Sequence, residues 1–263
     1  MDLSILTNGV ITLTKSVGDF IRREAILFDP SKIEYKGLND MVSYVDKTAE
    51  IQLVSGLSKL LPAAGFITEE GTAESSDQAY TWIIDPLDGT TNFIHGIPTF
   101  AVSIALYFNH EPLIGVVYEV NRDECFYAWK EGGSYLNGKS ISVSARQNIS
   151  SSLLATGFPY YDFEKQQPYL RVFNDLMQKC HGLRRIGSAA VDLAYVAAGR
   201  FDGYFEYNLK SWDVAAGALI VQEAGGTVMD FAGGKDFIDK KELIASNNLI
   251  AGELLAAIKK EFN

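Results

Sequence analysis

The spacing of the apolar residues changes along this chain, and that change limits the folds it can adopt. From Leu3 to Ile21 the apolar residues recur every three or four positions, which predicts a long amphipathic helix. The polar residues 29–40 are expected to form a loop or hairpin, and a second helix should follow Asp46. From Phe100 to Val143 apolar and polar residues alternate between turn sequences, which predicts an antiparallel sheet packed against the two helices.

The second part of the chain has a different pattern, in which short apolar segments alternate with helical ones. The expected strands are residues 153–155, 182–186, 202–207, 226–229 and 243–245, and the expected helices are residues 165–179, 189–198, 214–224 and 252–262. These periods leave both an α/β and an α+β fold open. Because 263 residues is at the upper edge for one domain, we expect a single unit, 1–263, with an N-terminal helix and antiparallel-sheet half, 1–150, and a C-terminal α/β half, 151–263.

The composition restricts the classes of partner. A formal net charge of −10 argues against a nucleic-acid or anionic-membrane surface, because both need basic patches to replace counterions. An anionic substrate remains compatible with this charge if divalent cations are bound, since they reverse the local sign. No apolar run reaches membrane-spanning length. The cysteines, Cys125 and Cys180, have no metal-like spacing and the N-terminus lacks signal-peptide features, so a reducing cytoplasm is expected.

Residues 82–93 carry the strongest chemical signal in the chain. The apolar residues Trp82–Ile84 predict a buried strand with Asp85 at its carboxyl end, where open α/β sheets place ligands, and Pro86 is expected to stop the strand. Asp88 brings a second carboxylate. Hard oxygen ligands of this kind suit Mg²⁺ together with phosphate oxygens, so the pair indicates metal-assisted transfer of a phosphoryl group to water.

The end of this stretch favours an anion-binding turn. Gly89 permits a positive φ, and Thr90 or Thr91 is expected to cap a short helical turn over residues 92–95, whose free N–H groups would face an anion. The same composition is also typical of an ordinary turn in which Asp and Asn side chains satisfy local backbone groups. The stretch alone does not decide between these two interpretations.

Three further segments favour the metal site. Glu69-Glu70 precedes the stretch, and Trp212-Asp213-Val214-Ala215-Ala216-Gly217 and Glu223-Ala224-Gly225-Gly226 follow it. Together with residues 82–93 they resemble, in order, the signatures of the inositol monophosphatase family. The resemblance implies alternating layers of helices and sheets, α-β-α-β-α, with the site between the halves, and it suggests a homodimer.

The resemblance also implies a function. This is Mg²⁺-dependent, lithium-sensitive hydrolysis of small phosphomonoesters, with inositol 1-phosphate or a related polyol phosphate as substrate and two or three Mg²⁺ ions at the site. Other members of the family hydrolyse fructose 1,6-bisphosphate, nucleotide bisphosphates or histidinol phosphate, and the continuation Thr91-Asn92-Phe93 favours the inositol branch. Because some bacterial relatives associate with the transcription machinery, a regulatory binding protein is the alternative from another class.

Carried onto this sequence, the family pattern assigns the metal to Glu69, Asp85, the Leu87 carbonyl, Asp88 and Asp213. Water would be activated by Glu69 and by Thr90, whose hydroxyl can relay a proton to Asp46. The substrate contacts implied by the resemblance are Asp88, Gly89, Thr90, Gly187, Ser188, Ala189, Glu206 and Asp213.

Some of these features have a purely structural alternative. Asp213 begins an alanine-rich helix, where the helix dipole stabilises an acid, and Ser188 fits an N-cap. Residues 133–140 match the P-loop expression, but a strand-like alternation follows Ser140 where a P-loop needs a helix. We therefore interpret Asn137-Gly138 as a hairpin turn.

Overall fold

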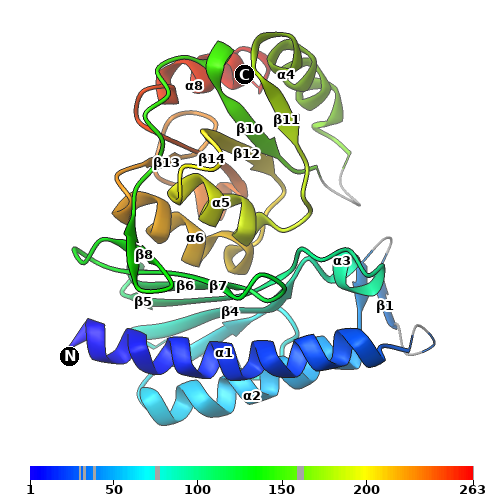
Figure 1. Ribbon diagram of the computed structural model, residues 1–263, viewed down its shortest axis with the longest axis vertical. Helices are drawn as coiled ribbons and strands as arrows, with labels where there is room; N and C mark the ends of the chain where they lie inside the picture. Colours follow the sequence, from blue (N-terminus) through cyan, green and yellow to red (C-terminus); the bar gives the residue numbers. More distant parts are fainter. Residues whose placement is uncertain (30, 32–33, 38–39, 75–77, 159–162, 263) are drawn as a thin grey trace.

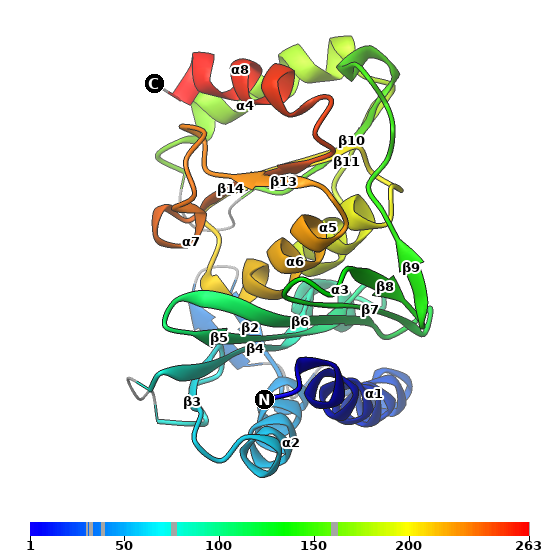
Figure 2. The same ribbon diagram turned by 90° about the vertical axis from the view of Figure 1, so that its left-hand side faces the viewer.

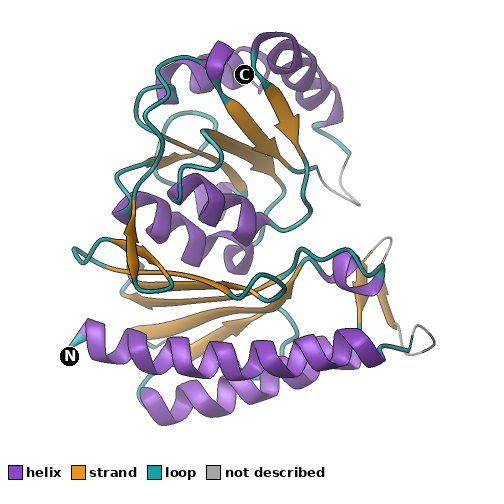
Figure 3. Cartoon of the chain, viewed as in Figure 1, coloured by secondary structure: helices purple, strands orange, loops and turns teal. Residues whose placement is uncertain are grey.

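The structure is a computed structural model that describes every residue except 30, 32–33, 38–39, 75–77, 159–162 and 263. Helices and sheets alternate in five layers (Figures 1 and 2). Two long helices form the first layer, two shorter helices lie between the sheets, and two more cover the far side of the second sheet (Figure 3). The predicted α-β-α-β-α layering is confirmed. None of the described helices is long and apolar enough to cross a membrane.

The first two layers are the two predicted helices and the predicted antiparallel sheet. α1 (Leu3–Leu27) and α2 (Tyr44–Leu60) pack against each other and on the seven-stranded sheet. In spatial order its strands are β3 (Gly65–Thr68), β4 (Tyr80–Asp88), β5 (Ala101–Phe108), β6 (Glu111–Glu119), β7 (Glu124–Trp129), β8 (Ser134–Leu136) and β9 (Lys139–Ile141). Only the β3–β4 pair is parallel among these strands.

A hairpin is present at Asn137-Gly138, as predicted, and also in the segment expected to form a loop or hairpin. β1 (Glu34–Gly37) and β2 (Asp40–Val42) pair antiparallel in the polar segment between the two helices. At the other hairpin, φ is 47° at Asn137 and 81° at Gly138, as a two-residue turn between twisted strands requires. The strand β9, and not a helix, begins at the end of the P-loop-like sequence, which excludes the P-loop interpretation.

The layers of the second part are built around a mixed sheet. Its strands, in spatial order, are β11 (Gly182–Arg184), β10 (Leu153–Thr156), β12 (Gly203–Tyr207), β14 (Glu242–Ser246) and β13 (Thr227–Met229). β10 pairs parallel with β11 and β12, whereas β14 pairs antiparallel with β12 and β13. The helices of this part are α4 (Gln166–Lys179), α5 (Ala189–Ala197), α6 (Ser211–Glu223), α7 (Phe237–Lys240) and α8 (Ala251–Phe262). The four-residue helix α7 was not predicted, since it is too short to show a helical period.

The helix α6 is apolar on almost every side because both of its faces are covered. It packs against β5, β6 and β7 on one side and against β13 and β14 on the other. Its eight residues from Val214 to Val221 are all buried. The loss of a clear amphipathic stripe is what a helix between two sheets requires.

Two expectations about residues 82–95 are wrong. β4 does not stop at Pro86 but continues to Asp88. Its pairing with β5 is irregular between Asp85 and Asp88, so the missing N–H of the proline falls where no regular ladder bond is needed. The helical turn, α3 (Thr90–Ile94), begins two residues earlier than expected, with Gly89 as its N-cap and no capping side chain.

Candidate active site

Acidic side chains from three elements meet near the end of β4. Because β3 and β4 run parallel, their carboxyl ends lie at one edge of the sheet, and Glu69 N donates to Ile84 O at 3.2 Å. Asp85 is 2% exposed. Burial and the carboxylates of Glu69, Asp88 and Asp213 raise the pKa of Asp85 well above its ordinary value. The four predicted metal-binding carboxylates are thus close enough to repel one another.

Leu87 lies between the two aspartates of β4. Its side chain is fully buried in the core beneath α1 and α2. Its N–H donates to Asp85 Oδ1 at 2.9 Å, and its carbonyl accepts a hydrogen bond from Thr90 Oγ1 at 3.0 Å. The predicted carbonyl ligand therefore adjoins both Asp85 and the predicted water-activating hydroxyl.

Asp88 joins the first sheet to the start of α5. Its Oδ2 accepts hydrogen bonds from Ser188 Oγ at 2.6 Å and from Ala190 N at 2.7 Å. Burial raises the pKa of Asp88, and these bonds, with one from the Ala189 backbone, oppose the rise. Ser188 is also the N-cap of α5, because its Oγ accepts from Val191 N at 3.3 Å. Two of the predicted substrate residues, Ser188 and Ala189, therefore already bind an anion, which is the Asp88 carboxylate.

Asp213 and Glu206 are the other two predicted acids of the site. Asp213, in the first turn of α6, accepts a hydrogen bond from Lys210 N at 2.6 Å, so its structural role at the helix start is real. Burial, together with Asp88 and Glu206, raises the pKa of Asp213 to about 8. Burial raises the pKa of Glu206 to about 7, although Tyr204, whose hydroxyl donates to Glu206 Oε2 at 2.5 Å, opposes the rise.

The two side chains of the predicted proton relay lie within hydrogen-bonding distance of each other. Thr90 Oγ1 lies 3.0 Å from Asp46 Oδ1, and Asp46 is fully buried in the first turn of α2. The other oxygen of Asp46 accepts from Ser43 N at 2.9 Å and from Ser43 Oγ at 2.6 Å. Burial raises the pKa of Asp46, and the hydrogen bonds from Ser43 and Thr90 oppose the rise. Because Thr90 has one hydroxyl hydrogen, it can serve either Asp46 or the Leu87 carbonyl at a given moment.

Two glycines allow the segments of the site to approach each other. Gly89 has φ 94°, and a Cβ there would lie 3.1 Å from Thr99 O and 3.2 Å from Gly187 O. Gly187 has φ 89°, and a Cβ there would lie 2.9 Å from Asn92 Nδ2. The start of α3 and the segment before α5 are therefore in backbone contact, which a side chain at either position would disturb.

Sequence reasoning did not predict the roles of two buried polar residues that shape this region. Asn92 donates from Nδ2 to the carbonyl oxygens of Thr99 and Ile186, both at 2.8 Å, and so joins α3 to the segment before α5. Glu50 is fully buried on α2 and binds the chain that follows Glu69. A signal for Glu50 was its spacing of four residues from Asp46 on one helix face. No local signal pointed to the role of Asn92, because Ile186 is 94 residues away in sequence.

The donor set fits a hard divalent cation. All the predicted ligands offer oxygen atoms, and Mg²⁺ prefers carboxylate and carbonyl oxygens. Within the described part of the chain, no three His, Cys, Asp or Glu side chains already stand at ligand spacing around one point. The fit therefore rests on ligand chemistry and on the repulsion of the buried Asp85 by Glu69, Asp88 and Asp213, which a bound cation would relieve.

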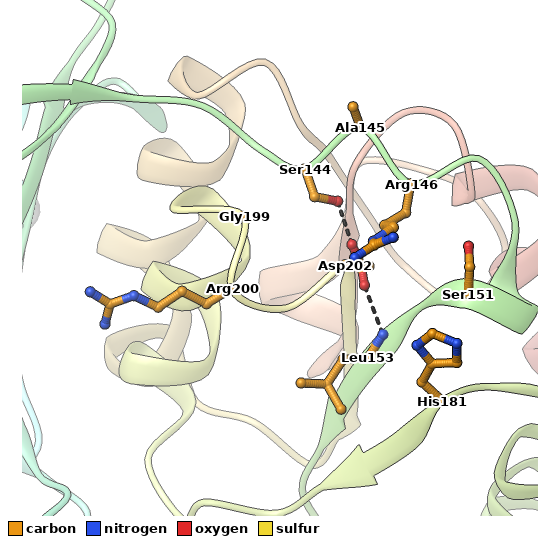
Figure 4. A pocket seen from close by; sticks show the side chains of 9 residues that line it. All are labelled: Ser144, Ala145, Arg146, Ser151, Leu153, His181, Gly199, Arg200 and Asp202. Atoms are coloured by element: carbon orange, nitrogen blue, oxygen red, sulfur yellow. Dashed lines mark hydrogen bonds between the residues drawn. The ribbon is translucent and has the colours of Figure 1, made fainter.

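A cavity of about 520 Å³ lies elsewhere, beside the connection from the first sheet to the second (Figure 4). None of the predicted site residues lines it. The Asp202 carboxylate in its wall accepts hydrogen bonds from Ser144 Oγ at 2.5 Å and from Leu153 N at 2.7 Å. Asp202 thereby ties the connecting segment to the beginnings of β10 and β12, which is a structural role.

Comparison with known proteins decides the family. Residues 2–262 match the family model described as the inositol monophosphatase family. The chain belongs to this family. It is 40% identical over 261 residues to the inositol-1-monophosphatase of Mesorhizobium japonicum, covering 99% of this chain and 98% of that one. It is 42% identical over 261 residues to Nus factor SuhB of Pseudomonas aeruginosa, covering 97% and 96%.

A solved inositol monophosphatase structure agrees with this assignment. The structure from Anabaena (Nostoc) sp. PCC 7120 superposes with a TM-score of 0.88 at 32% identity, covering 99% of this chain and 98% of that one. The layered inositol monophosphatase fold and the resemblance found in the motifs are thus confirmed. Membership of the inositol monophosphatase family supports a phosphatase, while the two relatives bear names of different kinds, an enzyme and a Nus factor.

Proposed function

We propose that this protein is a Mg²⁺-dependent phosphatase of small phosphorylated polyols, with inositol 1-phosphate as the first candidate substrate. The observation that carries the proposal is the convergence of the Glu69, Asp85, Asp88 and Asp213 carboxylates at one end of β4. Burial and three neighbouring carboxylates raise the pKa of Asp85, and a bound cation would stabilise its charged form. A purely structural turn would not require four carboxylates.

The ions would be held by Glu69, Asp85, the Leu87 carbonyl, Asp88 and Asp213, which is enough oxygen for two or three Mg²⁺. Bound Mg²⁺ supplies positive charge that attracts phosphate oxygens and lowers the pKa of water. The fold brings these ligands together from the end of β3, from β4 and from α6. The attacking water and the phosphate could then be held in line.

The chain's own proton route would run from water through Thr90 to Asp46. Thr90 would receive a proton at Oγ1 while passing its own to Asp46 Oδ1, 3.0 Å away. Burial raises the pKa of Asp46, which makes its carboxylate a better proton acceptor than an exposed one. Glu69, which follows β3, would orient the same water. Because water itself attacks the phosphate, no phosphorylated enzyme is needed.

The substrate would lie between the two halves of the site. Gly89 and Thr90 would contact the phosphate, and the segment Gly187–Ala189 would contact substrate oxygens beside Asp88. Glu206 and Asp213 would accept hydrogen bonds from the hydroxyl groups of the polyol. Burial raises the pKa of both acids, so their contact with a hydroxyl depends on the charge that bound Mg²⁺ contributes.

A substrate panel with a phosphate-release assay tests the proposal. Inositol 1-phosphate, fructose 1,6-bisphosphate, a nucleotide bisphosphate and histidinol phosphate are compared with Mg²⁺ and with EDTA. We expect the highest kcat/KM for inositol 1-phosphate, no turnover in EDTA, and inhibition by Li⁺ beyond that of Na⁺. No phosphate release from any of the four substrates would overturn the proposal, and a preference for another substrate would change only its specificity.

The relative named Nus factor SuhB favours a second candidate, a regulatory binding protein with this fold. Capture of RNA polymerase by the tagged protein would support it, and the turnover-deficient variant Asp88→Asn should then retain that capture. Capture that fails in wild-type protein while phosphate is released would exclude it. In either case we expect a homodimer, which light scattering after gel filtration measures.

A further inference from the structure

Glu50 makes an unusual set of hydrogen bonds for a buried acid on a helix. It lies on α2 and its side chain is fully buried. Its Oε2 accepts from Glu70 N at 2.7 Å, and its Oε1 accepts from Thr72 N and from Thr72 Oγ1, both at 2.8 Å. All three donors belong to residues 70–72, so one carboxylate fixes one short segment.

That segment directly follows Glu69. On the amino side of Glu69, its N–H donates to Ile84 O at 3.2 Å, which extends the β3–β4 pairing by one residue. On its carboxyl side, Glu50 holds the N–H of Glu70. The peptide groups on both sides of the Glu69 side chain are therefore fixed, one by the sheet and the other by Glu50.

The helix α2 contacts Thr90 directly and the chain next to Glu69, and these are the two residues that would activate water. Asp46 and Glu50 are four residues apart, which places them on one face of the helix. Asp46 accepts a hydrogen bond from Thr90 at 3.0 Å, and Glu50 binds the chain beside Glu69. We infer that Glu50 is a positioning residue that fixes the Glu69 carboxylate relative to Asp85 and Thr90. This inference rests on the proposed function, in which Glu69 binds Mg²⁺.

An acid that only anchors a loop would make the same hydrogen bonds. The effect of its removal on Mg²⁺ affinity would then be the same with or without the Glu69 carboxylate. A positioning role instead couples the two residues, because the position of Glu69 no longer matters once its charge is gone. The substitution Glu50→Gln is suited to the test. If its amide oxygen remains with the two donors of Thr72, its NH₂ group faces the N–H of Glu70, so the bond next to Glu69 is lost.

The experiment is a double-mutant cycle read by Mg²⁺ binding to the full-length protein without substrate. Titration calorimetry with Mg²⁺ alone is applied to wild type, Glu50→Gln, Glu69→Gln and the double variant. We expect Glu50→Gln to weaken Mg²⁺ binding by about tenfold or more, the loss typical of residues that support metal ligands. In the Glu69→Gln background, Glu50→Gln should cause no further loss.

A matched control is Glu119→Gln, which changes another fully buried glutamate that accepts a backbone N–H, from Arg122 at 2.6 Å. It should lower the melting temperature and leave Mg²⁺ affinity within twofold of wild type. If Glu50→Gln does not fold, Thr72→Val removes one of the three hydrogen bonds and should show a smaller loss with the same dependence on Glu69.

The outcomes separate the two proposals. Unchanged Mg²⁺ affinity in Glu50→Gln, or a loss that simply adds to that of Glu69→Gln, overturns the positioning role and leaves the proposed function intact. Unchanged affinity in Glu69→Gln overturns the proposed metal site and the positioning role with it.

Discussion

The Asp88 carboxylate accepts two hydrogen bonds at the start of α5. Burial nevertheless raises its pKa, and its negative charge raises the pKa of Asp85. In Asp88→Asn, the amide oxygen can still accept from Ser188 and Ala190, whereas the charge is removed. The metal-free variant should be as stable as wild type or more stable, because repulsion within the cluster falls. Its turnover should fall by roughly 100-fold or more, because the variant loses a ligand of the Mg²⁺ that would stabilise the charge of the transition state.

Thermal melting in EDTA and kcat at saturating Mg²⁺ measure these two effects separately. Asp175→Asn is the matched control, because Asp175 is a surface residue of α4 that pairs with Lys179. It should change neither quantity appreciably. Substantial activity of Asp88→Asn at saturating Mg²⁺ would remove Asp88 from the site.

The pKa of Glu206 predicts how the metal-free protein responds to pH. Burial raises it from 4.5 to about 7, so between these values the folded protein holds a proton that the unfolded chain has released. The stability that this proton gives the folded state is complete below pH 4.5 and is lost as the pH rises through about 7. Asp213, whose pKa burial raises to about 8, acts in the same direction. Stability in EDTA should therefore fall from pH 5.5 to 8.5, with Glu206 contributing on the order of 2 kcal/mol over this range.

Urea unfolding in EDTA across this pH range tests the prediction. Glu206→Gln, which cannot titrate, should show a shallower slope than wild type. A stability that rises with pH, or a slope that Glu206→Gln leaves unchanged, would contradict the assignment.

At the scale of single residues, the sequence could predict which acids belong together but not what holds them. The motifs name Asp88, yet its partners Ser188 and Ala190 are about 100 residues away in sequence. Glu50 escaped notice for a related reason. Its partners follow Glu69 at a separation of about 20 residues, so the spacing from Asp46 indicates a shared helix face but not the segment that Glu50 binds.

At the scale of elements, the junction of β4 with α3 depends on Gly89. The residue combines a φ of 94° with close contacts to the carbonyl oxygens of Thr99 and Gly187. Gly89→Ala should therefore strain the backbone and separate α3 from the segment before α5. We expect a loss of about 1–3 kcal/mol in the free energy of unfolding and a marked fall in kcat/KM, measured by urea unfolding and phosphate release.

Gly96→Ala is a control that separates the cost of a positive φ from the cost of close packing. Gly96 also has a positive φ, 68°, but a Cβ there would meet nothing within 4 Å. It should lose about 1 kcal/mol, from the left-handed conformation alone, and keep its activity. Equal losses of activity in the two variants would show that close packing at Gly89 is unimportant.

Elements with a long period were predictable, and those that depend on tertiary pairing were not. The 25 residues of α1 and the hairpin at Asn137-Gly138 carry their own local signals. The continuation of β4 through Pro86 has no local signal. It depends on an irregular pairing with β5, in which no N–H is required from the proline. The resulting irregularity lies between the two aspartates of the candidate site.

At the scale of the whole molecule, the proposed ligands come from both sides of the interior. Asp85 and Asp88 belong to the first sheet, while Asp213 begins α6, which packs against both sheets. The apolar periods predicted that helices and sheets would be present, and the family resemblance supplied their order of layers. Neither could supply the charge balance, since the repulsion of Asp85 by Glu69, Asp88 and Asp213 becomes visible only when these elements are assembled.

Mg²⁺ should therefore stabilise the entire fold by joining elements that otherwise repel each other. A ligand that binds only the folded state adds about 2.7 kcal/mol at 100 times its dissociation constant, which for a chain of this size raises the melting temperature by roughly 5–10 °C. The rise should shrink strongly in Asp85→Asn and in Asp213→Asn, because each removes a ligand from a different layer. It should persist in Glu131→Gln, which alters an exposed acid in the turn after β7. Melting curves at increasing MgCl₂, with NaCl matched for ionic strength, provide the measurement. Equal shifts in all three variants would mean that Mg²⁺ acts by screening the net charge of −10 and not by binding between the layers.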